Sequence, residues 1–438
     1  MVSSGVIVLL GWDVDVSPGR EWTGPTFLVE PIRRVHISLR AQKERRGCLV
    51  GGGVSDYPVR PRKIRTWGAL ECPEARPGPK DGYRSTADAG PLWLRDFFPG
   101  YFAMVMGTGI VAVAARLLGR NALAWPLFAI SLAAYPVLWA ILLARIGCFP
   151  RAVLQDFVSH ERGPAFLTIV AANGVLGSLF SVFNTMTALL PALLWFSVAL
   201  WAVLVYGFLS AVTISAAKPD LEHGLNGAWL LLVVATESIS VLACFLALRT
   251  GAPPPLVFAA LAFYLLGATL YVLLAALIFF RWVFRSLHPA EMGAPWWINM
   301  GAVAIATMAG ARLMALPGND PNLLLLQRFV APFTVLLWAT STFWIPPLAI
   351  MFVWKELQRG PHGYDPGLWS VVFPLGMYVT ATHDYATVGH LPFLDAIPHV
   401  VFWIALPAWV LTFCGMWLRL LPHASLPSGW RHHHAGPP

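Results

Sequence analysis

Long apolar stretches recur along the chain from residue 92 onward, and short polar connections separate them. Each stretch has about 20 residues or more, which is enough for an α-helix to cross the hydrocarbon core of a bilayer. The stretches cover residues 100–118, 122–146, 164–186, 189–215, 227–249, 256–284, 296–315, 328–354, 366–387 and 397–421. The pattern therefore predicts an all-α polytopic membrane protein with about ten transmembrane helices.

The odd-numbered stretches begin at intervals of roughly 63 to 70 residues, which predicts five repeated helical hairpins. The first helix of each hairpin carries small and polar residues. The second is mostly Leu, Ala, Val, Phe and Trp, with several Ser and Thr in the fourth and eighth stretches. Small residues let helices approach closely, and polar residues avoid lipid. We therefore expect an inner ring of first helices around a central pore and an outer ring that faces lipid. Close packing of the same helices without a pore is the alternative.

Composition supports the membrane class. Hydrophobic residues make up 57% of the chain and charged residues 12%, the latter about half the share found in soluble domains. The five cysteines show no paired spacing, so neither a disulfide framework nor a metal site is predicted. The formal net charge of +8 does not indicate nucleic-acid binding, because many Lys and Arg residues precede the first apolar stretch.

The apolar pattern divides the chain into three segments. Residues 1–92 are rich in Arg, Gly, Pro and Asp, so we expect a disordered, basic cytoplasmic extension. A basic arm on anionic lipid, or upstream sequence translated from a misplaced start, are the alternatives. The helical domain covers 93–421, and 422–438 form a short cytoplasmic tail. Lys and Arg are more frequent in the connections on the side of the N-terminus, so the positive-inside rule predicts both termini in the cytoplasm of a cell-membrane protein.

The ninth apolar stretch contains Phe373 next to Pro374. Proline has no N–H, so the carbonyl of Ser370 loses its helical partner and must be satisfied by protein or by water. A broken helix with small and polar residues beside a large aromatic ring indicates a lined conduit with Phe373 as its plug. A proline kink packed inside a helix bundle is the alternative.

Small or polar residues within the odd-numbered stretches are the candidates for lining the pore. They are Gly107, Thr108, Asn173, Gly174, Thr236, Glu237, Asn299, Thr307, Gly376 and Thr380. Arg116 and Arg312, near predicted outer helix ends, are candidates for attracting anions, although terminal arginines also snorkel to headgroups without such a role. His383 and Asp384 could form a pH-sensitive pair or an interfacial hydrogen bond.

Glu237 lies near the middle of the fifth stretch, where a charged side chain costs several kcal/mol. We therefore expect it to be neutral or paired. A titrating carboxyl beside an anion path is what proton-coupled symport needs, whereas an ionised carboxylate would repel the substrate. A protonated or hydrogen-bonded Glu at a helix interface, without a transport role, is the alternative.

Five sequence motifs resemble the tellurite-resistance and C4-dicarboxylate transporter family, which includes plant slow anion channels, fungal malate permeases and sulfite efflux pumps. The motifs are PGYFAMVMGTGIV at 99–111, RGPAFLTIVAANGVLGS at 162–178, KPDLEHGLNGAWLLLVVATESISVL at 218–242, PWWINMGAVAIATMAGA at 295–311 and YDPGLWSVVFPLGMY at 364–378. The resemblance implies hairpins around a central pore, commonly a homotrimer with one pore per subunit, and a pore-blocking phenylalanine, which Phe373 matches. It also implies an uncharged residue, often Gln, where this chain has Glu237.

The combined interpretation is transport of small anions across a lipid bilayer without a cofactor. The anions are C4-dicarboxylates such as malate, or chloride, nitrate, sulfite or tellurite. A gated channel and a proton-coupled dicarboxylate symporter that uses Glu237 both remain open. The chain has no GxxxxGK[ST], HExxH, GxSxG or CxxCH motif, so we expect neither ATP-driven transport by this chain nor an enzyme. An intramembrane oxidoreductase subunit, which would need facing histidines in the bilayer, is the alternative from another class.

Overall fold

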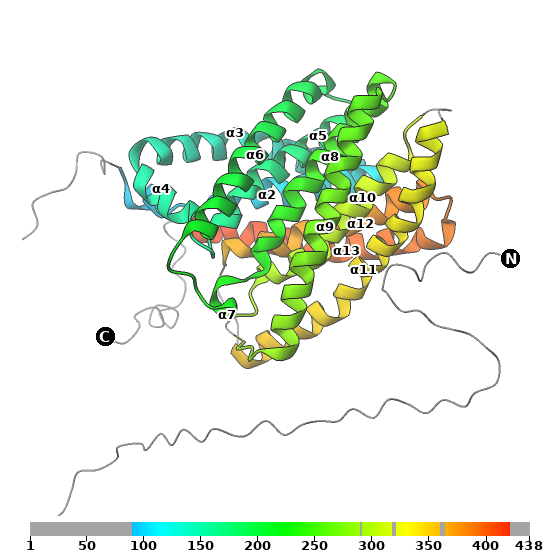
Figure 1. Cartoon of the computed structure of the whole chain (residues 1–438). Helices are drawn as coiled ribbons and strands as arrows, with labels where there is room; N and C mark the ends of the chain where they lie inside the picture. The colour runs from blue at the N-terminus through cyan, green and yellow to red at the C-terminus, as the bar shows by residue number, and fades with distance from the viewer. Residues whose placement is uncertain (1–89, 290, 318–320, 360–363, 421–438) are drawn as a thin grey trace, which may run out of the picture. The chain divides into compact units, whose positions relative to one another are not determined.

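The computed structural model describes residues 90–289, 291–317, 321–359 and 364–420. The predicted extension at 1–92, apart from its last three positions, and the predicted tail at 422–438 lie outside the described residues. Within these residues the chain forms α-helices and short 3-10 helices, and no β-strand (Figure 1).

Ten of the described helices have 15 residues or more, and each overlaps one predicted stretch. They are α2 (Phe102–Leu117), α3 (Asn121–Cys148), α5 (Thr168–Val182), α6 (Leu190–Ile214), α8 (Leu231–Thr250), α9 (Pro254–Phe284), α10 (Ile298–Met314), α11 (Pro321–Arg359), α12 (Trp369–Val388) and α13 (Ala396–Leu420). The short helices α1 (Leu92–Arg95), α4 (Pro150–Phe157) and α7 (Leu221–Gly224) were not predicted. The helix α11 is also longer than predicted at both ends.

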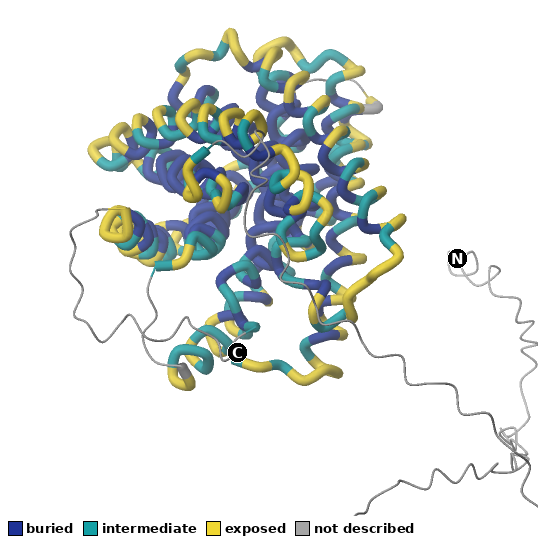
Figure 2. Tube along the Cα trace, turned by 90° about the vertical axis from the view of Figure 1, so that its left-hand side faces the viewer, coloured by how far each residue is buried: buried dark blue, intermediate teal, exposed yellow. Residues whose placement is uncertain are grey.

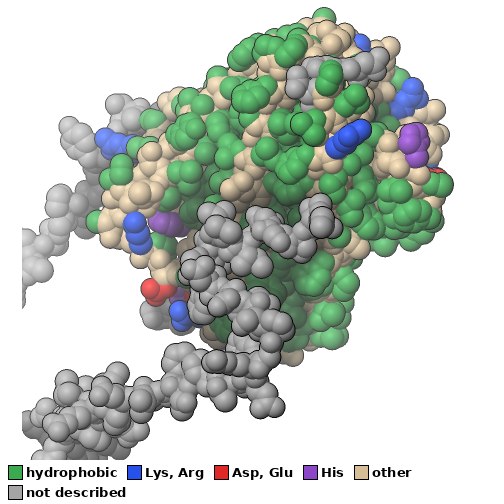
Figure 3. Space-filling view, turned by 45° about the vertical axis from the view of Figure 1, so that its right-hand side comes forward, with side chains coloured by type: hydrophobic (Ala, Val, Ile, Leu, Met, Phe, Trp, Pro, Cys, Tyr) green, Lys and Arg blue, Asp and Glu red, His purple; other side chains and the backbone are tan. Residues whose placement is uncertain are grey.

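Eight of the long helices, some with the turn that precedes them, are long and apolar enough to cross a membrane. The other two are α10, which has 17 residues, and α12, whose second half carries Thr380, Thr382, His383 and Asp384. Hydrophobic side chains cover much of the face seen in Figure 3, with isolated basic groups among them. The chain is therefore an all-α polytopic membrane protein.

The long helices form two rings, as the repeat predicted. The helices α2, α5, α8, α10 and α12 contact one another in that order, and α12 contacts α2, so the inner ring is closed. Each outer helix packs on the inner helix of its own hairpin. The spans of α2, α5 and α8 are 78%, 89% and 94% buried, whereas those of the five outer helices are 17% to 33% buried (Figure 2).

A short 3-10 turn precedes every inner helix. These turns are η1 (Pro99–Tyr101), η2 (Gly163–Leu167), η4 (Gly227–Leu230), η5 (Ala294–Trp297) and η6 (Pro366–Leu368). Four of them have proline in the first two positions, where a missing N–H costs nothing. Each turn contacts the next around the ring, and η6 contacts η1. We call this closed set of turns the collar. It brings the N-termini of all five inner helices to one end of the protein.

Two buried arginines fasten the connections at the collar end. Arg145, at the end of α3, is 1% exposed and donates to the carbonyl of Arg95 at 2.8 and 3.0 Å. Its guanidinium also pairs with Asp156 of α4 at 2.6 Å. Arg281, near the end of α9, pairs with Glu291 at 3.0 Å. Both side chains anchor the connection that leads to the next hairpin.

Candidate functional site

The helix α12 contacts its neighbours on three sides. Val372 and Gly376 pack against α2, and Pro374 packs against α10. On the outer side, α13 packs against α12, and Tyr378 is hydrogen-bonded to Thr342 of α11 at 2.8 Å. Because side chains three and four residues apart share one face of a helix, these contacts fix how α12 is rotated within the ring.

The fourth side of α12 carries Phe373, Met377, Thr380 and Asp384. Their spacing of four, three and four residues places them on one face, between the side that meets α2 and the side that meets α10. This face therefore points to the middle of the inner ring. Phe373 is 2% exposed and Thr380 is fully buried. The ring of Phe373 thus lies on the inner side of α12, in a position that water barely reaches.

The predicted break at Pro374 is wrong, because α12 is continuous from Trp369 to Val388 with the proline inside it. Gly301 of α10 explains how the proline is accommodated. A Cβ atom on Gly301 would lie 2.8 Å from the ring of Pro374, so only glycine leaves room for this close approach. The proline is thus a packing element between two inner helices.

The three glycines predicted to line a pore lie at contacts between inner helices. Gly107 of α2 faces Val372, Gly174 of α5 faces Ser238, and Gly376 of α12 faces α2. A Cβ atom on Gly174 would lie 2.6 Å from the Cβ of Ser238. These glycines let the inner helices approach one another closely.

Several polar candidates on the inner helices contact the outer ring. In each case a Trp or Tyr of an outer helix donates to the inner helix of the following hairpin, and the last hairpin closes onto the first. The bonds are Tyr135 to Asn173 (2.6 Å), Trp201 to Thr236 (2.9 Å), Trp338 to Thr382 (3.1 Å) and Trp409 to Thr108 (2.9 Å). We call these four bonds the ring clamps. They direct Asn173, Thr236 and Thr108 toward the outer ring.

Asn299 and Thr307 of α10 donate to backbone carbonyls three or four residues before them. The amide of Asn299 donates to the carbonyl of Trp296 at 3.3 Å, and the hydroxyl of Thr307 donates to the carbonyl of Val303 at 2.9 Å. Both side chains are fully buried. Among the predicted polar candidates, Thr380 is the one on α12, where its spacing of seven residues places it on the same face as Phe373.

Glu237 lies between α8 and α9. Its side chain is fully buried, and neither carboxylate oxygen has a hydrogen-bond partner among the described residues. The carboxyl group sits against Gly267 of α9. Ser240, three residues further on, donates to the carbonyl of Ala260 of α9 at 2.7 Å, so this face of α8 points to the outer ring.

The two arginine candidates lie at the C-terminal end of the inner ring. Arg116 of α2 donates to Asn121 at the start of α3, across the hairpin turn. Arg312 of α10 forms an ion pair with Asp384 at 2.6 Å. His383 and Asp384, which could have formed a pair, do not contact each other, since adjacent residues point in different directions on a helix. His383 instead faces Asp395, at 3.9 Å.

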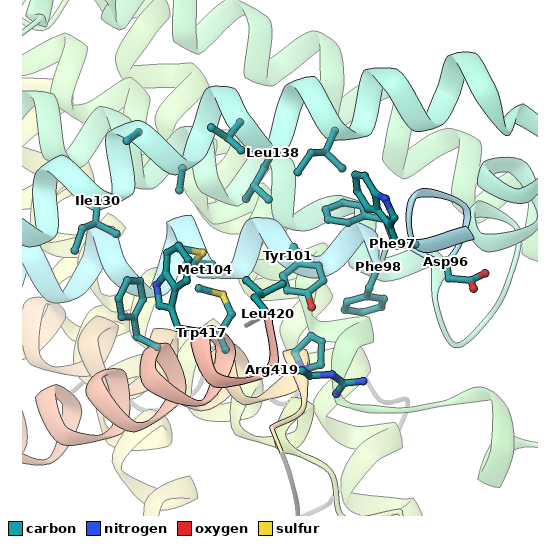
Figure 4. Close-up of a pocket in the computed structure, with 18 residues that line it drawn as sticks. Asp96, Phe97, Phe98, Tyr101, Met104, Ile130, Leu138, Trp417, Arg419 and Leu420 are labelled. Atoms are coloured by element: carbon teal, nitrogen blue, oxygen red, sulfur yellow. The ribbon is translucent and has the colours of Figure 1, made fainter. Parts of the chain in front are cut away.

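A separate cavity of about 820 Å³ lies between α2, α3 and α13 (Figure 4). Its lining is mostly apolar, with Asp96 and Arg419 toward one end. Met104 of α2 contributes to the lining and lies four residues before Thr108, which bonds to α13. The cavity therefore opens on the outer side of α2, away from the face that carries Phe373.

Comparison with known proteins identifies the family. The sequence profile of the voltage-dependent anion channel family matches residues 96–417. An uncharacterized membrane protein of Mycobacterium tuberculosis is 37% identical over 148 residues, covering 34% of this chain and 75% of that protein. An uncharacterized transporter of Methanocaldococcus jannaschii is 22% identical over 327 residues, covering 73% and 94%. The sulfite efflux pump SSU1 of Arthroderma benhamiae is 22% identical over 351 residues, covering 73% and 90%. Since the match covers nearly all of both rings, this chain belongs to the voltage-dependent anion channel family, whose members transport anions.

Proposed function

We propose that this protein conducts small anions passively through the middle of the inner ring and that Phe373 blocks the path. The observation that carries the proposal is the inward face of α12, on which the buried ring of Phe373 precedes Met377 and Thr380. An aromatic ring at a constriction can block a path that a methyl group would leave open. Pro374 supports this role, because it directly follows Phe373 and its close contact with Gly301 fixes the backbone at this position.

The collar supports anion selectivity. Each helix N-terminus carries a partial positive charge of about half an elementary charge, and the collar gathers the N-termini of all five inner helices. Backbone N–H groups at such ends attract anions. An anion at this end of the inner ring is therefore attracted by backbone dipoles.

The substrate class follows from this weakly charged path. Hydroxyl groups and backbone dipoles discriminate poorly among small anions, so chloride, nitrate, sulfite, tellurite and malate are all candidates. Sulfite is the first to test, because three of the fungal relatives are named as sulfite efflux pumps.

The test is the Phe373→Ala variant in planar bilayers, with sulfite or malate on one side and chloride on the other. We expect large anion-selective currents in the variant and little current in the unmodified protein. Phe402→Ala, which removes a buried phenylalanine from the outer helix α13, is the matched control and should stay silent. Silence of a folded Phe373→Ala variant, or equal currents in both variants, would contradict the proposal.

Proton-coupled symport through Glu237 is the second candidate. A buried carboxyl group without hydrogen-bond partners favours its neutral form, because an unpaired charge is costly to bury. Its contact with α9 argues against direct contact with the substrate. In vesicles with an inward proton gradient, this candidate predicts malate uptake that Glu237→Gln abolishes. Uptake that survives the substitution would remove it.

We further propose a homotrimer in the cytoplasmic membrane with both termini in the cytoplasm. The connections at the collar end carry Arg151, Arg162, Lys218 and Arg285, and the positive-inside rule places such an end in the cytoplasm. Native mass spectrometry of the detergent-solubilised protein would measure the oligomeric state. Single cysteines placed in the collar-end connections, treated with a thiol reagent in intact cells, would show on which side of the membrane these connections lie. Labelling by a reagent added outside would contradict this orientation.

A further inference from the structure

The ion pair of Arg312 and Asp384 joins three inner helices at one level. The two side chains, from α10 and α12, are 17% and 7% exposed and lie 2.6 Å apart. The guanidinium of Arg312 also stacks over the ring of Phe245 from α8, at 4.7 Å from the centroid. The guanidinium group, the carboxylate and the aromatic ring thus come from α10, α12 and α8, at the C-terminal end of the inner ring.

The pair lies on the same face of α12 as Phe373. Asp384 follows Phe373 by eleven residues, which corresponds to three helical turns and about 16 Å along the axis. On α10, Arg312 follows Gly301 by the same eleven residues, so the two lie on the same face of that helix. Gly301 packs directly against α12, so Arg312 also lies on the side of α10 that meets α12. The inward face of α12 is therefore occupied at two levels, by Phe373 and by the ion pair.

The chemistry of the pair matches that of the transported anions. A guanidinium group presents a planar fork of N–H donors that binds carboxylates and oxyanions. In this structure the Oδ2 atom of Asp384 lies 2.6 Å from a terminal nitrogen of the guanidinium, as a close ion pair without an aligned hydrogen bond. The Nε atom of Arg312 is buried and has no hydrogen-bond partner among the described residues. The carboxylate of Asp384 therefore stands where a carboxylate or sulfite anion would bind.

We propose that Arg312 is an anion-binding site within the path, and that Asp384 holds it closed until an incoming anion displaces the aspartate carboxylate. The proposal rests on the proposed function, because it assigns a second closure to the same path. It assigns to Asp384 the role of an internal competitor, which lowers the affinity of Arg312 for the transported anion.

The main test compares Asp384→Asn with Asp395→Asn, each combined with Phe373→Ala. Asp395 is an exposed carboxylate near His383 and serves as the matched control for the loss of one negative charge at this end. We expect Asp384→Asn to lower the half-saturating sulfite concentration of the current by about tenfold, the scale of a desolvated charge contact. Addition of Arg312→Gln should abolish that gain. An equal effect of Asp395→Asn, or no effect of Asp384→Asn, would overturn the proposal.

A binding measurement separates this proposal from the proposed function. With Phe373 intact, the melting temperature of purified Asp384→Asn should rise with added sulfite at concentrations that leave the parent protein and Asp384→Asn/Arg312→Gln unchanged. If Phe373→Ala conducts nothing, the proposed path fails while this measurement still tests the site. Equal responses of all three proteins would overturn the site itself.

The exchange variant Arg312→Asp/Asp384→Arg covers the case in which Asp384→Asn does not fold. It keeps one guanidinium and one carboxylate in contact, so its half-saturating sulfite concentration should match that of the parent protein. A value about tenfold lower would contradict the competitor role of the carboxylate.

Discussion

The contact between Gly301 of α10 and Pro374 of α12 gives a quantitative test of inner-ring packing. A Cβ atom on Gly301 would lie 2.8, 3.0 and 3.1 Å from the Cγ, Cβ and Cα atoms of Pro374. Ordinary contacts of a Cβ atom begin at 3.4 Å, so the two helices would have to separate by about 0.6 Å, the difference between 3.4 and 2.8 Å. The proline ring cannot rotate away, because it is part of the backbone.

We therefore expect Gly301→Ala to destabilise the protein. Overpacking of this kind costs about 1–3 kcal/mol, and the better helix propensity of alanine returns about 0.5–1 kcal/mol. The net destabilisation should then be on the order of 1 kcal/mol, and no more than about 2.5 kcal/mol. The measurement is the free energy of unfolding in mixed detergent micelles, followed by circular dichroism.

Gly147→Ala in α3 is the matched control. No atom lies within 4 Å of the position that its Cβ would occupy, so only the helix propensity changes. We expect this variant to gain about 0.5–1 kcal/mol. If Gly301→Ala behaved like Gly147→Ala, the close contact between α10 and α12 would not exist in the protein, and the rotation of α12 inferred from it would be unsupported.

Three further substitutions test other contacts by the same unfolding measurement. Trp409→Phe removes one ring clamp and should cost about 0.6 kcal/mol, the average for hydrogen bonds between membrane helices, whereas Trp195→Phe, at an exposed position of α6, should cost nothing. Arg145→Met leaves Asp156 with Arg162 as its remaining partner, at 3.2 Å. This variant should lower the free energy of unfolding by about 3–5 kcal/mol, and a decrease below about 1 kcal/mol would rule out a structural role of the pair. Glu237→Gln should leave stability unchanged or raise it, because no partner is lost, and strong destabilisation would instead reveal an ionised, paired carboxylate.

The helices and their order in the two rings could be predicted from the sequence because a bilayer restricts them strongly. A span must have a minimum length, and repeated hairpins place every first helix in the same direction. The collar was harder to foresee, since its turns have three to five residues and no periodicity. Their recurring Gly and Pro residues before an aromatic residue were nevertheless visible in the motifs.

The orientation of polar side chains could not be predicted in the same way. Thr108 and Thr380 both lie within stretches predicted for the inner ring, yet one bonds to Trp409 of the outer ring and the other shares a face with Phe373. The difference depends on how each helix is rotated about its axis. This rotation is determined by packing against neighbouring helices and cannot be read from composition. Tryptophans of the outer helices were the available signal, because a buried indole N–H needs an acceptor.

The arginines at the C-terminal end of the inner ring have a structural cause that precedes any role in transport. Five parallel helices place partial negative charges at that end, opposite the collar. Arg116, Arg249 and Arg312 lie in the last turns of α2, α8 and α10, where cations offset these charges. An anion on the proposed path would meet dipoles that attract it at the collar and dipoles that repel it at the other end. Arg116 and Arg249 would reduce that repulsion, whereas the charge of Arg312 is paired with Asp384. The side chains that stabilise the parallel helices thus also favour the proposed passage of anions at this end of the ring.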